Sequence, residues 1–144
     1  MNKETNGFTE EEKAAMKAHV KELKRSKKRN VEEDKQALLD AIAAMPPDGR
    51  AMAEKLHEII TANGSDLSPK TWYGMPAYAN ADGKVVVFFR GAEKFKERYL
   101  TLGFNQEASL DEGSMWPIAY ALTALTPADE KRIADLIKRA TGNE

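Results

Sequence analysis

The segment that most constrains the fold is an unbroken apolar run, Val85-Val86-Val87-Phe88-Phe89. β-Branched and aromatic residues favour strands, and a short apolar run bounded by turn residues is typical of a buried strand. Successive side chains of a strand point to opposite faces of its sheet, so the run predicts a sheet covered on both faces. We therefore expect a central strand over Lys84–Arg90 with helices on one face. Residues 8–45, a partner chain or a ligand can supply the second cover.

Extended segments on both sides of this run enlarge the predicted sheet. Strands are expected over Lys70–Tyr73 and Pro76–Ala79, and the turn residues 80–83 join the second of these to the central strand as a hairpin. Two more strands are expected over Arg98–Phe104 and Ile118–Thr123. The pattern predicts a twisted antiparallel sheet of four to five strands.

Helical patterns precede and follow the strands. The expected helices run from a capping-box spacing at Thr9 to a break at Asn30, over Glu32–Ala44 up to Pro46-Pro47, over Gly49–Ala62 with Asp48 as cap, and onward from Thr126-Pro127. Runs of helices and then strands indicate an α+β fold packed by helices. The junction near residues 25–33 predicts two parts, an N-terminal helical extension over 1–33 and an α+β domain over 34–144.

Composition narrows the classes of function. The 144 residues include no cysteine, which excludes disulfides, thiolate metal sites and cysteine nucleophiles. The net charge of −1 provides no overall field that attracts nucleic acid or an anionic membrane. The N-terminus lacks the apolar core of a signal peptide, and no stretch approaches the roughly 20 apolar residues that span a bilayer. We expect a cytoplasmic protein with no membrane partner and no nucleic-acid partner.

Catalytic and metal-binding patterns are sparse. The sequence contains no P-loop, no G-x-G-x-x-G, no G-x-S-x-G and no H-E-x-x-H, so we expect neither an enzyme nor a bound cofactor. Glu54, His57 and Glu58 have a spacing that can hold a metal on one helix. On a helical wheel Glu54 and Glu58 lie opposite the apolar side and His57 lies at its flank. A solvated helix face is the preferred interpretation, with a metal site as the alternative.

Aromatic side chains gather on and beside the predicted strands. They can form sheet core, because aromatics fit a pleated and half-buried surface. They can also line a pocket for a small molecule, and nearby basic residues such as Lys70 and Arg90 would then favour an anionic or aromatic ligand. The candidate pocket residues are Trp72, Tyr73, Met75, Tyr78, Phe88, Tyr99 and Trp116.

Four segments resemble one known family. W-Y-G-M-P-A-Y at 72–78, K-V-V-V-F-F at 84–89, L-G-F at 102–104 and the closing helix from Thr126 are similar to the domain of unknown function 1801 family. Its YdhG-like members are labelled frataxin-like iron chaperones. The resemblance covers about residues 36–141. It implies a frataxin-like fold, with helices on one face of a twisted antiparallel sheet, and a role with intracellular iron. It carries over no individual ligand residue.

Three functions follow as hypotheses. The first is a non-enzymatic binding protein with an aromatic-lined pocket on the sheet. The second, from the resemblance, is an iron-binding chaperone. The third is a protein-interaction module that docks through its N-terminal helix on another protein or on a second copy, which makes a homo-oligomer one expected state.

Overall fold

The computed structural model describes residues 10–93 and 96–142, and for residues 18–29 it describes the backbone only. The chain divides into two compact units, Met1–Glu33 and Asp34–Glu144. The described part of the first unit is helical and belongs to α1 (Glu10–Ala43), whose last residues lie in the second unit. None of the described helices has the length and apolarity needed to cross a membrane.

Helix α1 is continuous where a break was predicted. It runs through Asn30 without interruption for 34 residues. The prediction of a break was wrong because an exposed asparagine inside a helix costs only a few tenths of a kcal/mol, about 0.7 at most, and strong helix formers flank it. Glu10, Glu11 and Glu12 occupy the first turn, where negative charge complements the helix dipole. The predicted cap at Thr9 lies outside the described residues.

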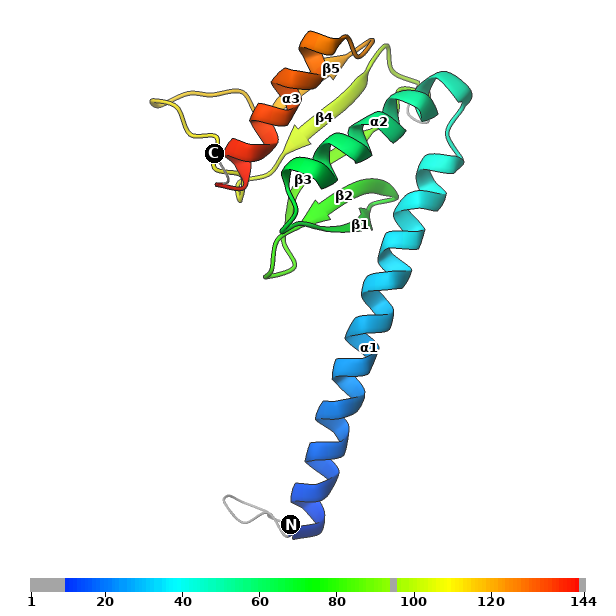
Figure 1. Ribbon diagram of the computed structural model, residues 1–144, viewed down its shortest axis with the longest axis vertical. Coiled ribbons are helices and arrows are strands. Elements are labelled where there is room, and N and C mark those ends of the chain that lie inside the picture. Colours follow the sequence, from blue (N-terminus) through cyan, green and yellow to red (C-terminus); the bar gives the residue numbers. More distant parts are fainter. Residues whose placement is uncertain (1–9, 94–95, 143–144) are drawn as a thin grey trace. The chain divides into compact units, whose positions relative to one another are not determined.

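The second unit has the predicted α+β composition (Figure 1). After α1 the elements are α2 (Pro47–Asn63), β1 (Ser68–Trp72), β2 (Met75–Ala79), β3 (Val85–Arg90), β4 (Leu100–Phe104), β5 (Ala119–Leu122) and α3 (Pro127–Ala140). All neighbouring strands are antiparallel, and the spatial order equals the chain order from β1 to β5. The predicted hairpin between β2 and β3 is confirmed.

The helix starts were predicted with mixed success. Thr126 caps α3 as expected: its hydroxyl accepts from the Asp129 N–H at 3.1 Å, and the Asp129 carboxylate accepts from the Thr126 N–H at 3.0 Å. Asp48 does not cap α2. Pro46 occupies the cap and Pro47 the first helical position. Proline is favoured at that position because a backbone N–H there has no partner within the helix, so proline loses no hydrogen bond.

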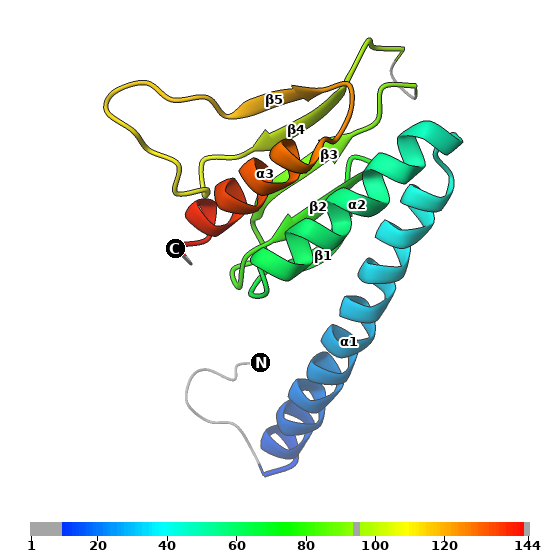
Figure 2. The same ribbon diagram turned by 45° about the horizontal axis from the view of Figure 1, so that its top comes forward.

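Helices α2 and α3 cover one face of the sheet, here called the helix face (Figure 2). Buried side chains from both helices join strand residues in one apolar cluster. Leu38 and Ile42 of α1 belong to the same cluster. The strand members are Tyr78, Val86, Val87, Phe89, Leu100, Leu102, Phe104 and Leu122.

A β-bulge explains part of the unbroken apolar run. Tyr78 pairs with Val87 and Ala79 pairs with Val85, so Val86 has no cross-strand partner in β2. Val86 and Val87 both lie in the helix-face cluster, whereas Val85 does not. A bulge of this kind places two consecutive side chains on one side. Asn105 bonds the strand at this point: its backbone N–H donates to the Val86 carbonyl at 3.0 Å and its side-chain amide to the Val85 carbonyl at 3.1 Å.

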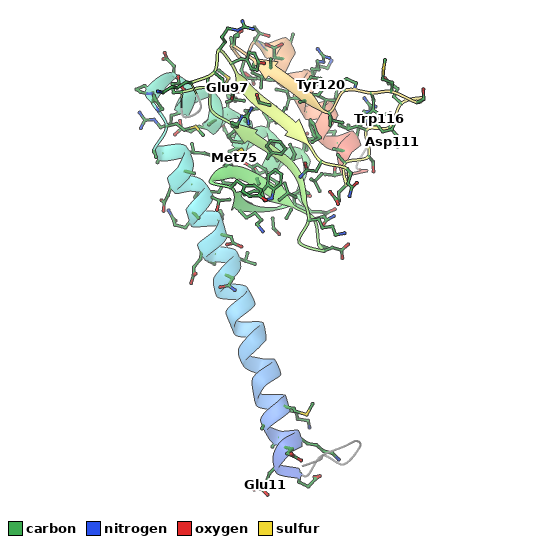
Figure 3. The ribbon with its side chains drawn as sticks, turned by 180° about the vertical axis from the view of Figure 1, so that it is seen from behind. Glu11, Met75, Glu97, Asp111, Trp116 and Tyr120 are labelled. Carbon is green, nitrogen blue, oxygen red and sulfur yellow. The ribbon has the colours of Figure 1, made fainter. Side chains whose placement is uncertain are left out.

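The opposite side of the sheet, here called the reverse face, differs from expectation. Residues 8–45 were one of three possible covers for it, but Leu38 and Ile42 of that segment pack into the helix-face cluster. Figure 3 views the second unit from this side, with the strands in front of α2 and α3. The face is shielded by its own side chains. Phe88 packs against Trp72, with ring centroids 5.1 Å apart, and its ring lies where a Cβ on Gly103 would be.

Candidate binding site

The predicted pocket residues do not surround one cavity. Trp72, Tyr73 and Phe88 come together, with ring centroids 5.0 Å apart for Trp72–Tyr73 and 5.1 Å for Trp72–Phe88. These three residues are called the aromatic patch below. Met75 lies beside the patch because it is the cross-strand partner of Trp72.

The other three aromatic candidates lie elsewhere. Tyr78 is fully buried on the helix face. Tyr99 is half-buried just before β4, with the Arg98 guanidinium 5.3 Å from its ring centroid. Trp116 lies in the loop between β4 and β5. The alternation of side chains along a strand could have predicted that Tyr78 and Met75 lie on opposite faces, because they are three residues apart.

The turn between β1 and β2 presents Tyr73 to solvent. Tyr73 and Gly74 have φ values of 51° and 76°, and they connect the paired residues Trp72 and Met75 in a two-residue hairpin. Asparagine and glycine are the usual residues with such dihedrals, and a bulky side chain there is strained by about 1–2 kcal/mol. The Tyr73 side chain is nevertheless 82% exposed, so burial of apolar surface does not explain the choice of a tyrosine.

A cavity of about 370 Å³ lies next to this turn and is called the turn cavity. Its walls come from the end of α1, the connection to α2, the start of β2 and the residues after β3. Its volume lies within the range of about 300–1,000 Å³ that is usual for ligand sites. The lining residues are Ala41, Ala44, Met45, Pro46, Gly74, Met75, Pro76, Arg90, Gly91 and Glu93.

Arg90 provides a positioned cation in the wall of the turn cavity. Its Nε lies 3.0 Å from Glu97 Oε1 and its Nη2 lies 3.1 Å from Glu97 Oε2. The Nη2 contact is a hydrogen bond and the Nε contact is an ion pair, so the Glu97 carboxylate holds the guanidinium in place, and both side chains are about two-thirds buried. The wall therefore combines apolar side chains with one oriented charged group.

Glu93 adds an acidic group to the same wall. Its carboxylate lies close to Gly49, in the first turn of α2, where a Cβ would come within 2.9 Å of Glu93 Oε1. The glycine thus leaves room for the carboxylate. Negative charge near a helix N-terminus is stabilising.

The three metal candidates on α2 do not share one environment. His57 was expected to face solvent, but it is half-buried and its Nδ1 lies 2.8 Å from the Tyr78 hydroxyl. Glu58 pairs with Lys55 at 3.7 Å on the surface, and Glu54 is exposed. Within residues 10–93 and 96–142, apart from side chains 18–29, no group of three or more His, Asp or Glu side chains is arranged to hold a metal ion.

The His57–Tyr78 pair joins α2 to β2 through a hydrogen bond that sequence reasoning missed. Burial lowers the pKa of His57 below its ordinary 6.5; the charge of Lys35 adds to the effect, and Glu58 opposes it. Burial raises the pKa of Tyr78 well above its ordinary 10.0. Both shifts favour a neutral pair, because a charge at this depth would lose its hydration. We read the pair as a polar link within the core.

Comparison with family models, curated proteins and solved structures gives no match for this chain. The geometry of the turn cavity and the aromatic patch is therefore the basis for a functional proposal.

Proposed function

We propose that this chain is a non-enzymatic binding protein that holds a small aromatic molecule in the turn cavity. The observation that carries the proposal is the cavity of about 370 Å³ beside an exposed, strained tyrosine. A bulky residue in the left-handed region is rare unless it has a local or functional reason. Contact with a ligand supplies such a reason for Tyr73.

The chemistry of the walls favours an aromatic ring. Met45 and Met75 line the cavity, and thioether sulfurs make favourable contacts with aromatic rings. The guanidinium of Arg90 can bind an aromatic ring through a cation–π contact. Tyr73 next to the cavity can stack on a planar ligand, with centroid distances of about 4.5–7 Å.

Two further statements belong to this proposal. The resemblance noted in the sequence supports a frataxin-like second unit, whose helices α2 and α3 lie on one face of an antiparallel sheet. The lack of cysteine supports a protein that acts in the cytoplasm. An iron-chaperone role follows from the resemblance alone, and the binding role is preferred because a specific cavity supports it.

Trp72 provides the signal that tests the proposal, because its ring lies 5.0 Å from that of Tyr73. The Trp116→Phe variant leaves Trp72 as the sole tryptophan. We expect indole-free aromatic probes, such as phenylpropionate and benzyl alcohol, to shift its emission saturably. Cyclohexylpropionate, which matches phenylpropionate in charge and nearly in size, is expected to bind at least tenfold more weakly.

Two neighbouring alanines provide a matched pair of variants. Ala43 and Ala44 are both exposed, but only Ala44 lines the turn cavity. Ala44→Leu fills part of the cavity and is expected to weaken binding of phenylpropionate tenfold or more, whereas Ala43→Leu leaves it unchanged. Equal affinity in both variants, or no binding of any aromatic probe by calorimetry, would reject the turn cavity as the site.

A further inference from the structure

The two edges of the sheet differ in how they avoid pairing with other strands. β1 and β5 are the outer strands. β1 contains Pro69 and Lys70, and proline and lysine are residues that proteins use to protect an edge strand. β5 contains neither. No residue from Met115 to Thr123 is charged, although charged residues make up 31% of the chain. β5 is therefore the edge that the sequence leaves open to pairing.

The backbone of β5 has hydrogen-bonding groups that point away from the sheet. The Phe104 N–H donates to the Ile118 carbonyl at 2.7 Å, which sets the alternation along the β4–β5 ladder. Tyr120 and Leu122 consequently direct their N–H and C=O groups toward β4. Ala119 and Ala121 direct theirs outward. Both alanines are exposed, and Figure 2 shows β5 at the margin of the sheet.

Exposed apolar side chains accompany this open edge. Met115 is 87% exposed and Ile118 is 54% exposed, and both lie within four residues of the start of β5. Large exposed apolar groups next to each other indicate a contact surface more often than isolated ones do. The edge thus combines outward backbone groups with apolar side chains.

We propose that β5 pairs antiparallel with β5 of a second copy of this chain, about a two-fold axis. A two-fold contact requires a surface that is complementary to itself. In the register that opposes Ala119 to Ala121 of the second copy, Tyr120 faces its own counterpart and Ile118 faces Leu122. No charged residue faces another in this arrangement, and the outward groups of both alanines find partners.

The lack of charge along β5 favours a second copy, because a charged side chain near a two-fold axis would face its own like charge. The Arg132 guanidinium lies 5.5 Å from the Tyr120 ring centroid, and Arg132 and Asp135 of α3 both line a groove of about 210 Å³ with Trp116. The two-fold axis runs through Tyr120 and sets the two α3 helices antiparallel. Arg132 packs on the side chain that lies at the axis, and Asp135 lies one helical turn further along α3.

Cysteine cross-linking tests this pairing directly, because the chain has no cysteine of its own. The full-length variants Ala119→Cys and Ala121→Cys, mixed and mildly oxidised, are expected to form a disulfide-linked pair faster than either variant alone. Ser68→Cys on the opposite edge is the matched control and is expected to stay unlinked. Equal slow linking of all three variants would overturn the proposal.

A protected version of β5 provides the second measurement. Ala121→Lys adds the charge that β1 already has, and it is expected to weaken self-association at least tenfold in sedimentation equilibrium with an unchanged circular dichroism spectrum. Thr71→Lys on β1 is the control and is expected to leave the association unchanged. A wild-type chain that sediments as a single copy at all concentrations up to about 0.5 mM, or one that binds only a foreign strand there, contradicts the proposal. Neither result bears on the turn cavity, which lies at other residues.

Discussion

The two faces of the sheet bury apolar side chains by different means. On the helix face, α2 and α3 cover a cluster in which Tyr78, Val87 and Phe89 are fully buried. On the reverse face, Phe88 lies across Gly103 and beneath Trp72. One face depends on elements distant in sequence, whereas the other depends on one large side chain placed beside a residue without a side chain. An apolar run therefore does not by itself require a second layer of helices.

Adjacent phenylalanines give the largest test of this difference. Phe89 is fully buried on the helix face, and Phe88 is half-buried on the reverse face. Phe89→Ala is expected to reduce the free energy of unfolding by about 3–5 kcal/mol. Phe88→Ala is expected to cost about 1–2 kcal/mol, because less surface returns to water. Urea unfolding followed by circular dichroism measures both.

If Phe89→Ala does not fold, Phe89→Leu and Phe88→Leu preserve the comparison with smaller losses. Equal losses at the two positions would mean that the reverse face is covered as fully as the helix face in solution. That result would restore the second cover that the apolar run first predicted.

Glycine-to-alanine substitutions give the second test. A Cβ at Gly103 would overlap the Phe88 ring, so Gly103→Ala is expected to cost about 1–3 kcal/mol and to change Trp72 emission as the ring moves. Gly91 is the matched control, since its Cβ would meet Met45 at an ordinary 3.7 Å. Gly91→Ala is expected to be neutral or to stabilise by about 0.4–1 kcal/mol. Similar thermal unfolding of the two variants would refute the close packing of Phe88 on Gly103.

The third test removes one atom from the helix face. Tyr78→Phe eliminates the hydrogen bond to His57 and is expected to cost about 0.5–1.5 kcal/mol in chemical unfolding. Tyr73→Phe makes the same change at a side chain that is 82% exposed, and little change in stability is expected. A Tyr78→Phe variant as stable as wild type would indicate that the pair contributes no net stability.

The sequence was sufficient to predict features that depend on neighbouring residues. The hairpin turn at 80–83, the cap at Thr126 and the α+β order follow from local chemistry, and all are present. The bulge at Val86 was not predictable, because nothing in the run distinguishes one valine from the next. Asn30 was misread because its weak helix preference was given more weight than the strong preferences around it.

The candidate site was predictable on one side only. Residues 72–76 were identified from their composition, and they form the turn and the adjacent wall of the turn cavity. The opposite wall, formed by Ala44, Met45 and Pro46, lies about 30 residues earlier in the chain. Contacts over that separation arise from tertiary packing, which apolar periodicity does not specify. The same limit hid the approach of His57 to Tyr78.

The dependence of stability on pH gives the smallest expected effect. It distinguishes the two faces because His57 contacts Tyr78 on the helix face. The pKa of His57 is lowered in the folded state, so between 6.5 and that lower value the unfolded chain binds more protons than the folded one. Stability is therefore complete above pH 6.5 and falls as the pH decreases below it. The groups that act on His57 are Lys35, which strengthens this trend, and Glu58, which opposes it. The carboxyl of Asp129 titrates outside this window, because hydrogen bonds from Thr126 lower its pKa below 3.8.

In His57→Gln the slope of stability against pH between pH 7 and 5 should diminish, while in Phe88→Leu on the reverse face it should persist. An unchanged slope in His57→Gln would mean that other groups cause the pH dependence and that protonation of His57 does not weaken its link to Tyr78.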